Sequence, residues 1–383
     1  MFIASRLRFK GKTAVVCIAV SFFVMIVAVA ISSGFRKELR TSLSEISGDI
    51  LLSTPDLNIM NETRPIDASG SYMSDIRSYD FVSDLVPVVW RAGIVKHGDD
   101  MHGIVVKGLP SGVSDSVALG VSIPRRLAQA SGLKPGDRML TYFVGENLKV
   151  RQFNVVAVHD ALVQTDDRYI VYASLSDMQR LNGWTAQQVS AVEVHLSDEI
   201  DDEEEIAEAT RLTGTLASLS EDGEDIVATS SLSRYPQLFN WLSLIDFNVG
   251  IILLLMTIVA GFNMISGLLI LLFENISTIG ILKSLGMNDR SISKVFLVAS
   301  ARLTGMGMLV GNLLALAFCL VQDKTHLLKL DPENYYVSFV PVDVEPLMIV
   351  AADAVSFAVI MVLLLIPTLF ISRVDPALTV RVR

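Results

Sequence analysis

The sequence contains little cysteine and no excess of positive charge. Of its 383 residues only Cys17 and Cys319 are cysteine, and both lie in long apolar stretches. Any domain outside those stretches must therefore hold together by its own core, without disulfides. The formal net charge is −10, from 31 Lys and Arg against 41 Asp and Glu. This excess of negative charge would repel the phosphates of a nucleic acid, so it excludes a general nucleic-acid-binding protein.

Catalytic and metal-binding motifs are also missing. The segment "GKT" at residues 11–13 resembles the end of a nucleotide-binding loop, but Arg6 stands where that loop needs glycine. The five histidines are scattered without a His-Glu-x-x-His pattern, and no serine lies in Gly-x-Ser-x-Gly. We therefore predict no active site and no metal site, and expect that the chain is not itself an enzyme.

Apolar residues, in contrast, are abundant: 51% of the chain is hydrophobic and the mean hydropathy is +0.50. A helix needs roughly 20 apolar residues to cross about 30 Å of hydrocarbon. Four stretches are long enough, and they are residues 13–35, 247–273, 295–322 and 346–372. The first two contain no charged residue, the third contains only Arg302 and the fourth only Asp353. We predict a membrane protein with four transmembrane helices.

Basic residues beside these spans predict their orientation, because Lys and Arg in short flanks are retained on the cytoplasmic side. Residues 1–12 carry Arg6, Arg8, Lys10 and Lys12 without any acid, and further basic residues lie in 274–294 and 373–383. These three segments are expected in the cytoplasm, and residues 36–246 and 323–345 outside. The first span is expected to be an uncleaved signal anchor, since it is followed by a basic pair and not by a small-residue cleavage site.

Residues 36–246 are long enough to form a domain with its own core. This segment contains 18 basic and 32 acidic residues. Two hairpins are predicted, "LVPVVWRAGIV" with "MHGIVVKGL" and "RMLTYFV" with "KVRQFNVVAV". Helices are predicted for "IPRRLAQASGLKPGD", ended by Gly132, for "SLSDMQRLNG" and for an acidic segment near 197–219. "RYIVYAS" is expected to be a buried strand and "VSAVEVHL" an alternating strand, so the domain is mixed α+β.

Helical spacing of apolar residues continues at both ends of this domain. Phe35, Leu39, Leu43 and Ile46 recur at this spacing within residues 34–52, so the first span is expected to continue outward as a rigid helix. The segment "SSLSRYPQLFNWLSLIDFNVG" leads into the second span in the same way. The two extensions predict a helical stalk that carries the outer domain.

Three polar residues lie inside the predicted spans. Arg302 is expected to extend its long side chain to the cytoplasmic surface. Asp353 is too short for that and needs a polar partner, since charge in hydrocarbon costs several kcal/mol. Asn312 falls near the same depth, so we expect Asp353 to face protein, and we expect no direct pairing of Arg302 with Asp353.

The stretch "ENISTIGILKSLGMNDRSISKVF" separates the second and third spans. Its apolar residues Ile276, Ile279, Leu282 and Leu285 recur at helical spacing. Gly286 is suited to end this helix and Asn288 to begin the next. The pattern indicates a short helix on the inner membrane surface, which could either be an ordinary interfacial loop or a place where another protein pushes.

This stretch resembles the cytoplasmic coupling segment of the FtsX/MacB-type (type VII) ABC transporter permeases. Within that superfamily the chain most resembles the lipoprotein-releasing (Lol, LolC/LolE-type) permeases, on "RLRFKGK", "SSGFRKEL", "NYYVSFVPVDV" and "IPTLFISRVDPALTVR". The resemblance covers all four spans and, more loosely, the outer domain. The residues assigned to coupling with an ATPase are Glu274, Ile276, Ile279, Gly280, Leu282, Lys283 and Gly286.

The resemblance implies a permease subunit with no cofactor of its own, which recruits two copies of a separate ATPase that bind ATP and Mg. A second permease subunit or a second copy of this chain completes the complex in the bacterial inner membrane. Lipoproteins destined for the outer membrane would enter from the outer leaflet between spans one and two, and would pass to a periplasmic carrier. ATP-driven motion would reach the outer domain by mechanotransmission along the two spans. Apolar residues assigned to an acyl-chain cavity are Val24, Met25, Ile31, Phe247, Ile251 and Met256, which equally suit surfaces that face lipid.

One feature departs from the family pattern. The subunit that recruits the carrier has a long protruding hairpin in its outer domain, whereas residues 144–149 here form a tight turn. This chain is therefore expected to be the lipoprotein-handling partner or a permease that works as a homodimer. Alternatives are an FtsX-like signalling permease that controls a cell-wall hydrolase, a MacB-like efflux permease, and a sensor or adhesion module anchored by its spans.

Overall fold

The computed structural model describes residues 12–55, 57, 64–97, 100–111, 113, 117–145, 148–160, 169–197, 200, 202–219, 225–331 and 335–368. The chain divides into two compact units. The membrane unit comprises Met1–Glu38, Asn240–Leu330 and Phe339–Arg383, and the outer unit comprises Leu39–Phe239 and Asp331–Ser338. The basic N-terminal flank up to residue 11 and the predicted cytoplasmic tail 373–383 lie outside the described residues.

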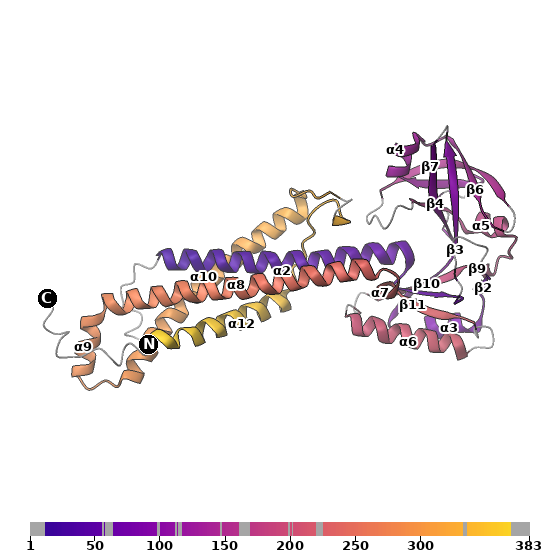
Figure 1. Ribbon diagram of the computed structural model, residues 1–383. Coiled ribbons are helices and arrows are strands. Elements are labelled where there is room, and N and C mark those ends of the chain that lie inside the picture. Colours follow the sequence, from indigo (N-terminus) through magenta and orange to yellow (C-terminus); the bar gives the residue numbers. More distant parts are fainter. Residues whose placement is uncertain are drawn as a thin grey trace. The chain divides into compact units, whose positions relative to one another are not determined.

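Among the residues that the structure describes, four helices are long and apolar enough to cross a membrane, which agrees with the predicted number of spans. They are α2 (Lys12–Ser47), α8 (Pro236–Glu274), α10 (Asp289–Thr325) and α12 (Pro346–Leu363), and Figure 1 shows them packed lengthwise. The last span continues as α13 (Leu365–Thr368) after a break at Leu364. Pro367 explains the break, because its ring lacks an N–H and clashes with the carbonyl four residues earlier.

Helix α10 packs on α2 through a stripe of small residues. Gly307 and Gly311 are buried in this stripe. A Cβ atom added to Gly311 would lie 2.5 Å from the carbonyl oxygen of Ala19, and one added to Gly307 would lie 2.6 Å from the Ile18 side chain. Only glycine allows the two backbones to approach this closely, as in other membrane helix pairs with small residues four apart.

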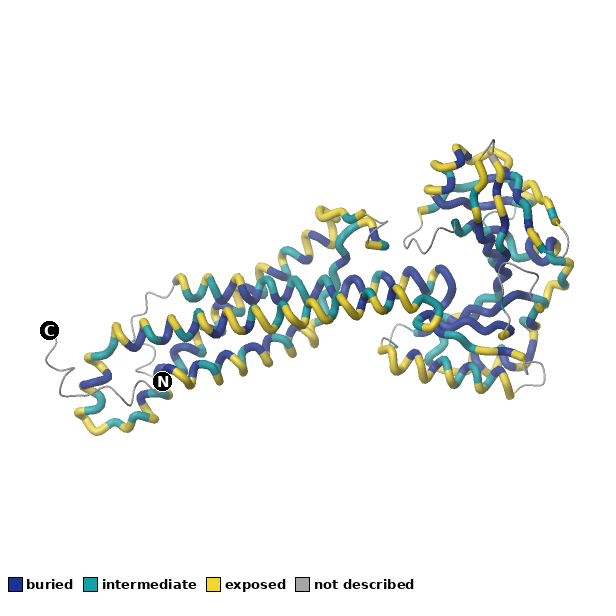
Figure 2. The backbone as a smooth tube through the Cα atoms, in the orientation of Figure 1, coloured by how far each residue is buried: buried dark blue, intermediate teal, exposed yellow. Residues whose placement is uncertain are grey.

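Helices α2 and α8 differ in how much of their surface the chain covers. Figure 2 shows buried residues along much of α2, whereas α8 exposes apolar residues along its length. Phe247, Leu254 and Phe262 are each more than 60% exposed. In a membrane such a surface faces either lipid or another subunit.

The outer unit contains a closed barrel of six strands. The ring runs β3 (Val82–His97), β4 (Asp100–Leu109), β8 (Tyr169–Ser174), β5 (Gly120–Pro124), β7 (Lys149–His159) and β6 (Arg138–Phe143). Strand β6 pairs back with β3 at Ile94, Val95 and Lys96, which closes the ring. Closure leaves the barrel without a free edge, and its interior is filled by side chains such as Val95, Phe143 and Phe153.

Strand β3 is long enough to belong to a second sheet as well. Its first half pairs with β10 (Ala191–Leu196), and the sheet continues through β1 (Ile50–Ser53) to β11 (Val227–Ser230). Helices α3 (Ser71–Arg77) and α6 (Glu203–Leu219) supply core residues to this part. The remaining elements are β2 (Ile66–Asp67), β9 (Gln188–Val189), α4 (Arg125–Ser131), α5 (Leu175–Asn182) and α7 (Ser231–Arg234).

The predicted α+β class and both predicted hairpins are confirmed. Gly132 ends α4 in the left-handed conformation, as expected. The first span continues as a helix beyond Phe35, as expected, and α2 ends at Ser47 because Gly48 has a positive φ of 66° and residues 50–53 pair in the sheet. One detail was wrong. Strand β10 does not alternate, since five of its six residues are buried between neighbouring strands and both faces of the sheet.

Candidate functional sites

The predicted coupling helix is present as α9 (Ile276–Ser284), which follows α8 after a break at Asn275. It ends as expected: Gly286 adopts a φ of 87°, and the Met287 N–H donates to the Leu282 carbonyl at 3.0 Å. This is the glycine-ended arrangement that satisfies the last carbonyls of a helix. Asn288 caps α10 by accepting from the Arg290 N–H, and Lys283 pairs with Asp289 at 2.9 Å.

The predicted coupling residues divide into a buried and an exposed set. Ile279 and Gly280 are buried and Ile279 belongs to the core of the membrane unit, with Ile276, Leu282 and Lys283 half-buried. Glu274 and Gly286 are exposed, and Leu285 is 78% exposed. Sequence reasoning missed Ile281, which is 52% exposed one turn before Leu285. The apolar spacing i, i+4 was visible in the sequence, but which side of α9 packs inward was not.

A polar clasp joins α2 to α8 inside the membrane unit. Arg36 pairs with Asp246 at 2.5 Å, and Ser32 donates a hydrogen bond to the other oxygen of the same carboxylate. The rings of Phe35 and Trp241 meet edge to face beside it, with centroids 5.5 Å apart. The sequence carried a signal for this pair: Arg36 directly follows the first uncharged run and Asp246 directly precedes the second.

Within the outer unit, the C-terminal end of α2 is capped by two cations. The Lys107 ammonium donates to the carbonyl of Ile46 at 2.7 Å, and the Arg234 guanidinium donates to the carbonyls of Ser47 and Gly48 at 2.9 and 2.8 Å. The last carbonyls of a helix have no partner within the helix and carry the negative end of its dipole, so cations there are stabilising. A residue of β4 and a residue of α7 therefore hold the end of α2.

The counter-charge for these cations is also buried. Glu193 on β10 contacts Lys107 at 2.8 Å, and both side chains are 1% exposed. Burial raises the pKa of Glu193 to about 7, although the nearby Lys107 opposes this change, and burial lowers the pKa of Lys107. Asp49, just past the helix, accepts from the Leu196 N–H at 2.9 Å and from Ser44 at 2.8 Å. These contacts tie the end of α2 to β10.

The residues predicted for an acyl-chain cavity lie on α2 and α8. Phe247 and Ile251 are 67% and 40% exposed, and Val24, Ile31 and Met256 are half-buried. Met25 is fully buried inside the membrane unit, so it is not on an open surface in this conformation. The other five have surface that lipid, an acyl chain or another subunit can contact.

Asp353 faces protein, as expected, whereas the expected reach of Arg302 to the cytoplasmic surface stays a prediction. Asp353 is 6% exposed and accepts a hydrogen bond from the Asn312 amide at 2.5 Å, which joins α12 to α10. Arg302 is exposed on α10. A further polar contact, Thr257 to Ser356 at 3.1 Å, joins α8 to α12 and was missed in the sequence. Hydrogen bonds of this kind hold membrane helices together where water is absent.

Comparison with known proteins matches the C-terminal part to a described family. Residues 250–376 match the FtsX-like permease C-terminal domain. The chain is 22% identical to the lipoprotein-releasing system transmembrane protein LolC of Xylella fastidiosa (strain Temecula1), over 98% of this chain and 94% of the relative. Identity is 23% to LolC of Neisseria meningitidis serogroup B, over 98% and 94%. It is 21% to LolE of Haemophilus influenzae, over 96% and 93%.

Among solved structures, the periplasmic region of MacB from Actinobacillus actinomycetemcomitans is similar to 53% of this chain and 98% of that chain, at 14% identity and a TM-score of 0.33. The extracellular domain of the transporter YknZ is similar to 47% and 99%, at 12% identity and a TM-score of 0.31. The chain carries an FtsX-like permease domain and is, over nearly its whole length, similar to the LolC and LolE lipoprotein-releasing permeases.

Proposed function

We propose that this chain is the permease subunit of a lipoprotein-releasing ABC transporter in the bacterial inner membrane. The observation that carries the proposal is the similarity to LolC, which extends over 98% of this chain and includes both the spans and the outer domain. ATP hydrolysis by two copies of a separate ATPase would extract lipoproteins from the outer leaflet, and a periplasmic carrier would receive them. A second permease subunit, or a second copy of this chain, completes the complex.

The exposed side of α9 is the surface we propose for contact with the ATPase. Ile281 and Leu285 are apolar, exposed and one helical turn apart, so they can enter a hydrophobic groove on a partner. Ile279 and Gly280, which the sequence also pointed to, would act from inside by fixing α9 to its own unit. Leu285→Glu and Ile281→Glu therefore test the contact more cleanly than a charge at either buried position.

Motion at α9 would travel through α8 and α2. Both helices are uninterrupted, from Pro236 to Glu274 and from Lys12 to Ser47. The Arg36–Asp246 clasp makes the two helices move together, and the capped end of α2 passes the motion to β10. This arrangement supports mechanotransmission, because each joint along the path is made of several simultaneous contacts.

Lipoprotein would reach the complex along the apolar surface of α8 and the first span, where Phe247 and Ile251 are exposed. Each CH₂ group moved out of hydrocarbon costs about 0.8 kcal/mol, so release of an acylated protein needs both an apolar receiving surface and ATP. The connection between β6 and β7 is short, with Phe143 paired to Lys149. Transfer to the carrier therefore would not use a long hairpin of this subunit.

Reconstitution tests the proposal directly. The chain is expressed with its ATPase, placed in proteoliposomes with an acylated lipoprotein, and supplied with ATP and a soluble carrier. ATP-dependent appearance of lipoprotein on the carrier is the expected result. Release without ATP, or co-purification of a cell-wall hydrolase in place of lipoprotein, would contradict the proposal, and the second result would favour a signalling permease.

A further inference from the structure

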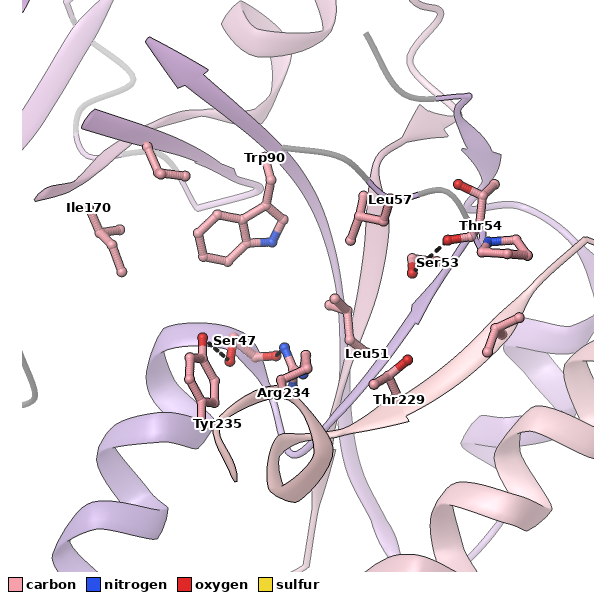
Figure 3. A pocket seen from close by; sticks show the side chains of 13 residues that line it. Ser47, Leu51, Ser53, Thr54, Leu57, Trp90, Ile170, Thr229, Arg234 and Tyr235 are labelled. Carbon is pink, nitrogen blue, oxygen red and sulfur yellow. Dashed lines mark hydrogen bonds between the residues drawn. The ribbon is translucent and has the colours of Figure 1, made fainter. Parts of the chain in front are cut away.

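The outer unit contains a cavity of about 460 Å³ where the barrel meets the second sheet. Trp90, Val105 and Ile170 border it from the barrel strands, and Leu51 and Val227 border it from β1 and β11. Figure 3 shows the indole of Trp90 on the side opposite Arg234 and Tyr235. The volume falls within the roughly 300–1,000 Å³ of small-ligand pockets.

The cavity lies over one face of the second sheet. Register places Leu51 opposite Thr229 and Ser53 opposite Val227, so these four alternate side chains share a face. The intervening residues Ile50 and Leu52 point the other way and belong to the core that α6 completes. One face of β1 and β11 is thus covered by the core, and the other borders the cavity.

Several polar groups of the wall already have hydrogen-bond partners. Arg234 donates to the Ser47 and Gly48 carbonyls, the Tyr235 hydroxyl donates to Ser47 at 3.3 Å, and Ser53 donates to the carbonyl of Thr54 at 3.2 Å. The Trp90 indole nitrogen is covered by other atoms, and the Thr54 hydroxyl and the Arg234 Nε are covered and have no hydrogen-bond partner among the described residues. A peptide segment bound here would lose its hydrogen bonds to water and would find few accessible partners in the wall to replace them, which is costly. A hydrocarbon chain would lose none.

We propose that this cavity binds one acyl chain of the lipid-modified substrate after the chain has left the membrane. Among the 13 described residues that line the cavity Arg234 is the only charged one, and its two terminal nitrogens already donate to the Ser47 and Gly48 carbonyls. The site therefore selects for the apolar chain and not for its polar end. The inference rests on the proposed function, which supplies an acylated protein to the outer unit. It adds a second apolar site, in the outer unit, to the surface on α2 and α8.

Trp90 makes the site directly observable. The chain contains three tryptophans, and replacing Trp184 and Trp241 by phenylalanine leaves Trp90 as the only reporter. The full-length chain in phospholipid nanodiscs is titrated with a dibrominated stearic acid, which quenches indole fluorescence on contact. The expected result is a saturable loss of most Trp90 fluorescence, which an added triacylated lipopeptide reverses although the nanodisc phospholipid does not.

Two substitutions provide a matched comparison. Val227→Phe fills the cavity from an edge strand where the valine is 44% exposed, and Val150→Phe makes the same change at a 40% exposed position on β7 outside the cavity. Val227→Phe should abolish saturable quenching and Val150→Phe should retain it. Thr229→Phe, on the same face as Val227, fills the cavity if Val227→Phe does not fold.

Three outcomes would overturn the inference: equal quenching in the filled and control variants, quenching that rises without saturation, or failure of the lipopeptide to reverse it. None of these depends on ATP-driven release. Loss of release with saturable, reversible quenching would refute the transport proposal and leave an acyl-chain site. Normal release without saturable quenching would refute only the site.

Discussion

Replacing Glu193 by glutamine should change how the stability of the outer unit depends on pH. Burial raises the pKa of Glu193 from an ordinary value of 4.5 to about 7. Between these two values the unfolded chain loses the proton while the folded chain keeps it, so the free energy of unfolding falls as pH rises. At about 1.4 kcal/mol for each pH unit, the loss across this window is about 3 kcal/mol.

Glutamine has no proton to lose in this range, so the variant escapes this loss. The variant should therefore gain about 3 kcal/mol relative to the wild type between pH 4.5 and 7. Taking the difference between the two proteins removes the pH dependence of all other groups. Lys107→Met should instead widen the pH range over which the free energy of unfolding falls. Without the nearby cation the pKa of Glu193 rises further, so this free energy keeps falling above pH 7.

Hydrogen exchange of the β10 and β1 amides, measured on the full-length chain in nanodiscs at several pH values, reports the free energy of opening of this sheet. Glu208→Gln is the matched control, because it removes a 67% exposed carboxylate with the same change in formal charge. Parallel curves for the wild type and Glu193→Gln across the window would refute the reasoning and would mean that the buried pair stays fully ionised.

Three further predictions concern the membrane unit. Leu285→Glu should leave the chain inserted but reduce recovery of the ATPase in pull-downs by tenfold or more, which corresponds to about 1.4 kcal/mol of binding free energy. Unchanged recovery would show that the exposed side of α9 does not contact the ATPase. Gly311→Leu should lower the thermal unfolding midpoint, because overpacking at this contact costs about 1–3 kcal/mol. Gly305→Leu is the control and should not lower it, since there is open space beside Gly305. Equal effects of the two variants would contradict the close approach of α10 to α2. Exchanging the two charges of the clasp gives a further test. Arg36→Asp alone should slow ATP-driven release, and adding Asp246→Arg should restore it, with at most about 1 kcal/mol effect on stability. A double variant as slow as the single one would exclude the clasp from transmission.

The sequence determined the features that depend on local composition. An uncharged run over residues 247–273 forms a helix in hydrocarbon, because only helices and closed β-barrels satisfy the backbone there and the run is far longer than a barrel strand. The glycine at 286 and asparagine at 288 determined the ends of α9 and α10, since caps act within one turn. The need of Asp353 for a polar partner likewise followed from the cost of isolated charge in a membrane.

Only the tertiary structure decided which distant residues meet. Lys107 and Glu193 are separated by 86 positions and Arg36 and Asp246 by 210, and no periodicity links such pairs. The face of α9 that packs inward, which buried Ile279 and exposed Ile281, depends on its neighbours and not on its own spacing. The end of α2 at Ser47 was decided in the same way, because residues 50–53 gain more from pairing with β10 and β11 than from another helical turn. Local chemistry limits what each segment can form, and long-range packing selects among those forms.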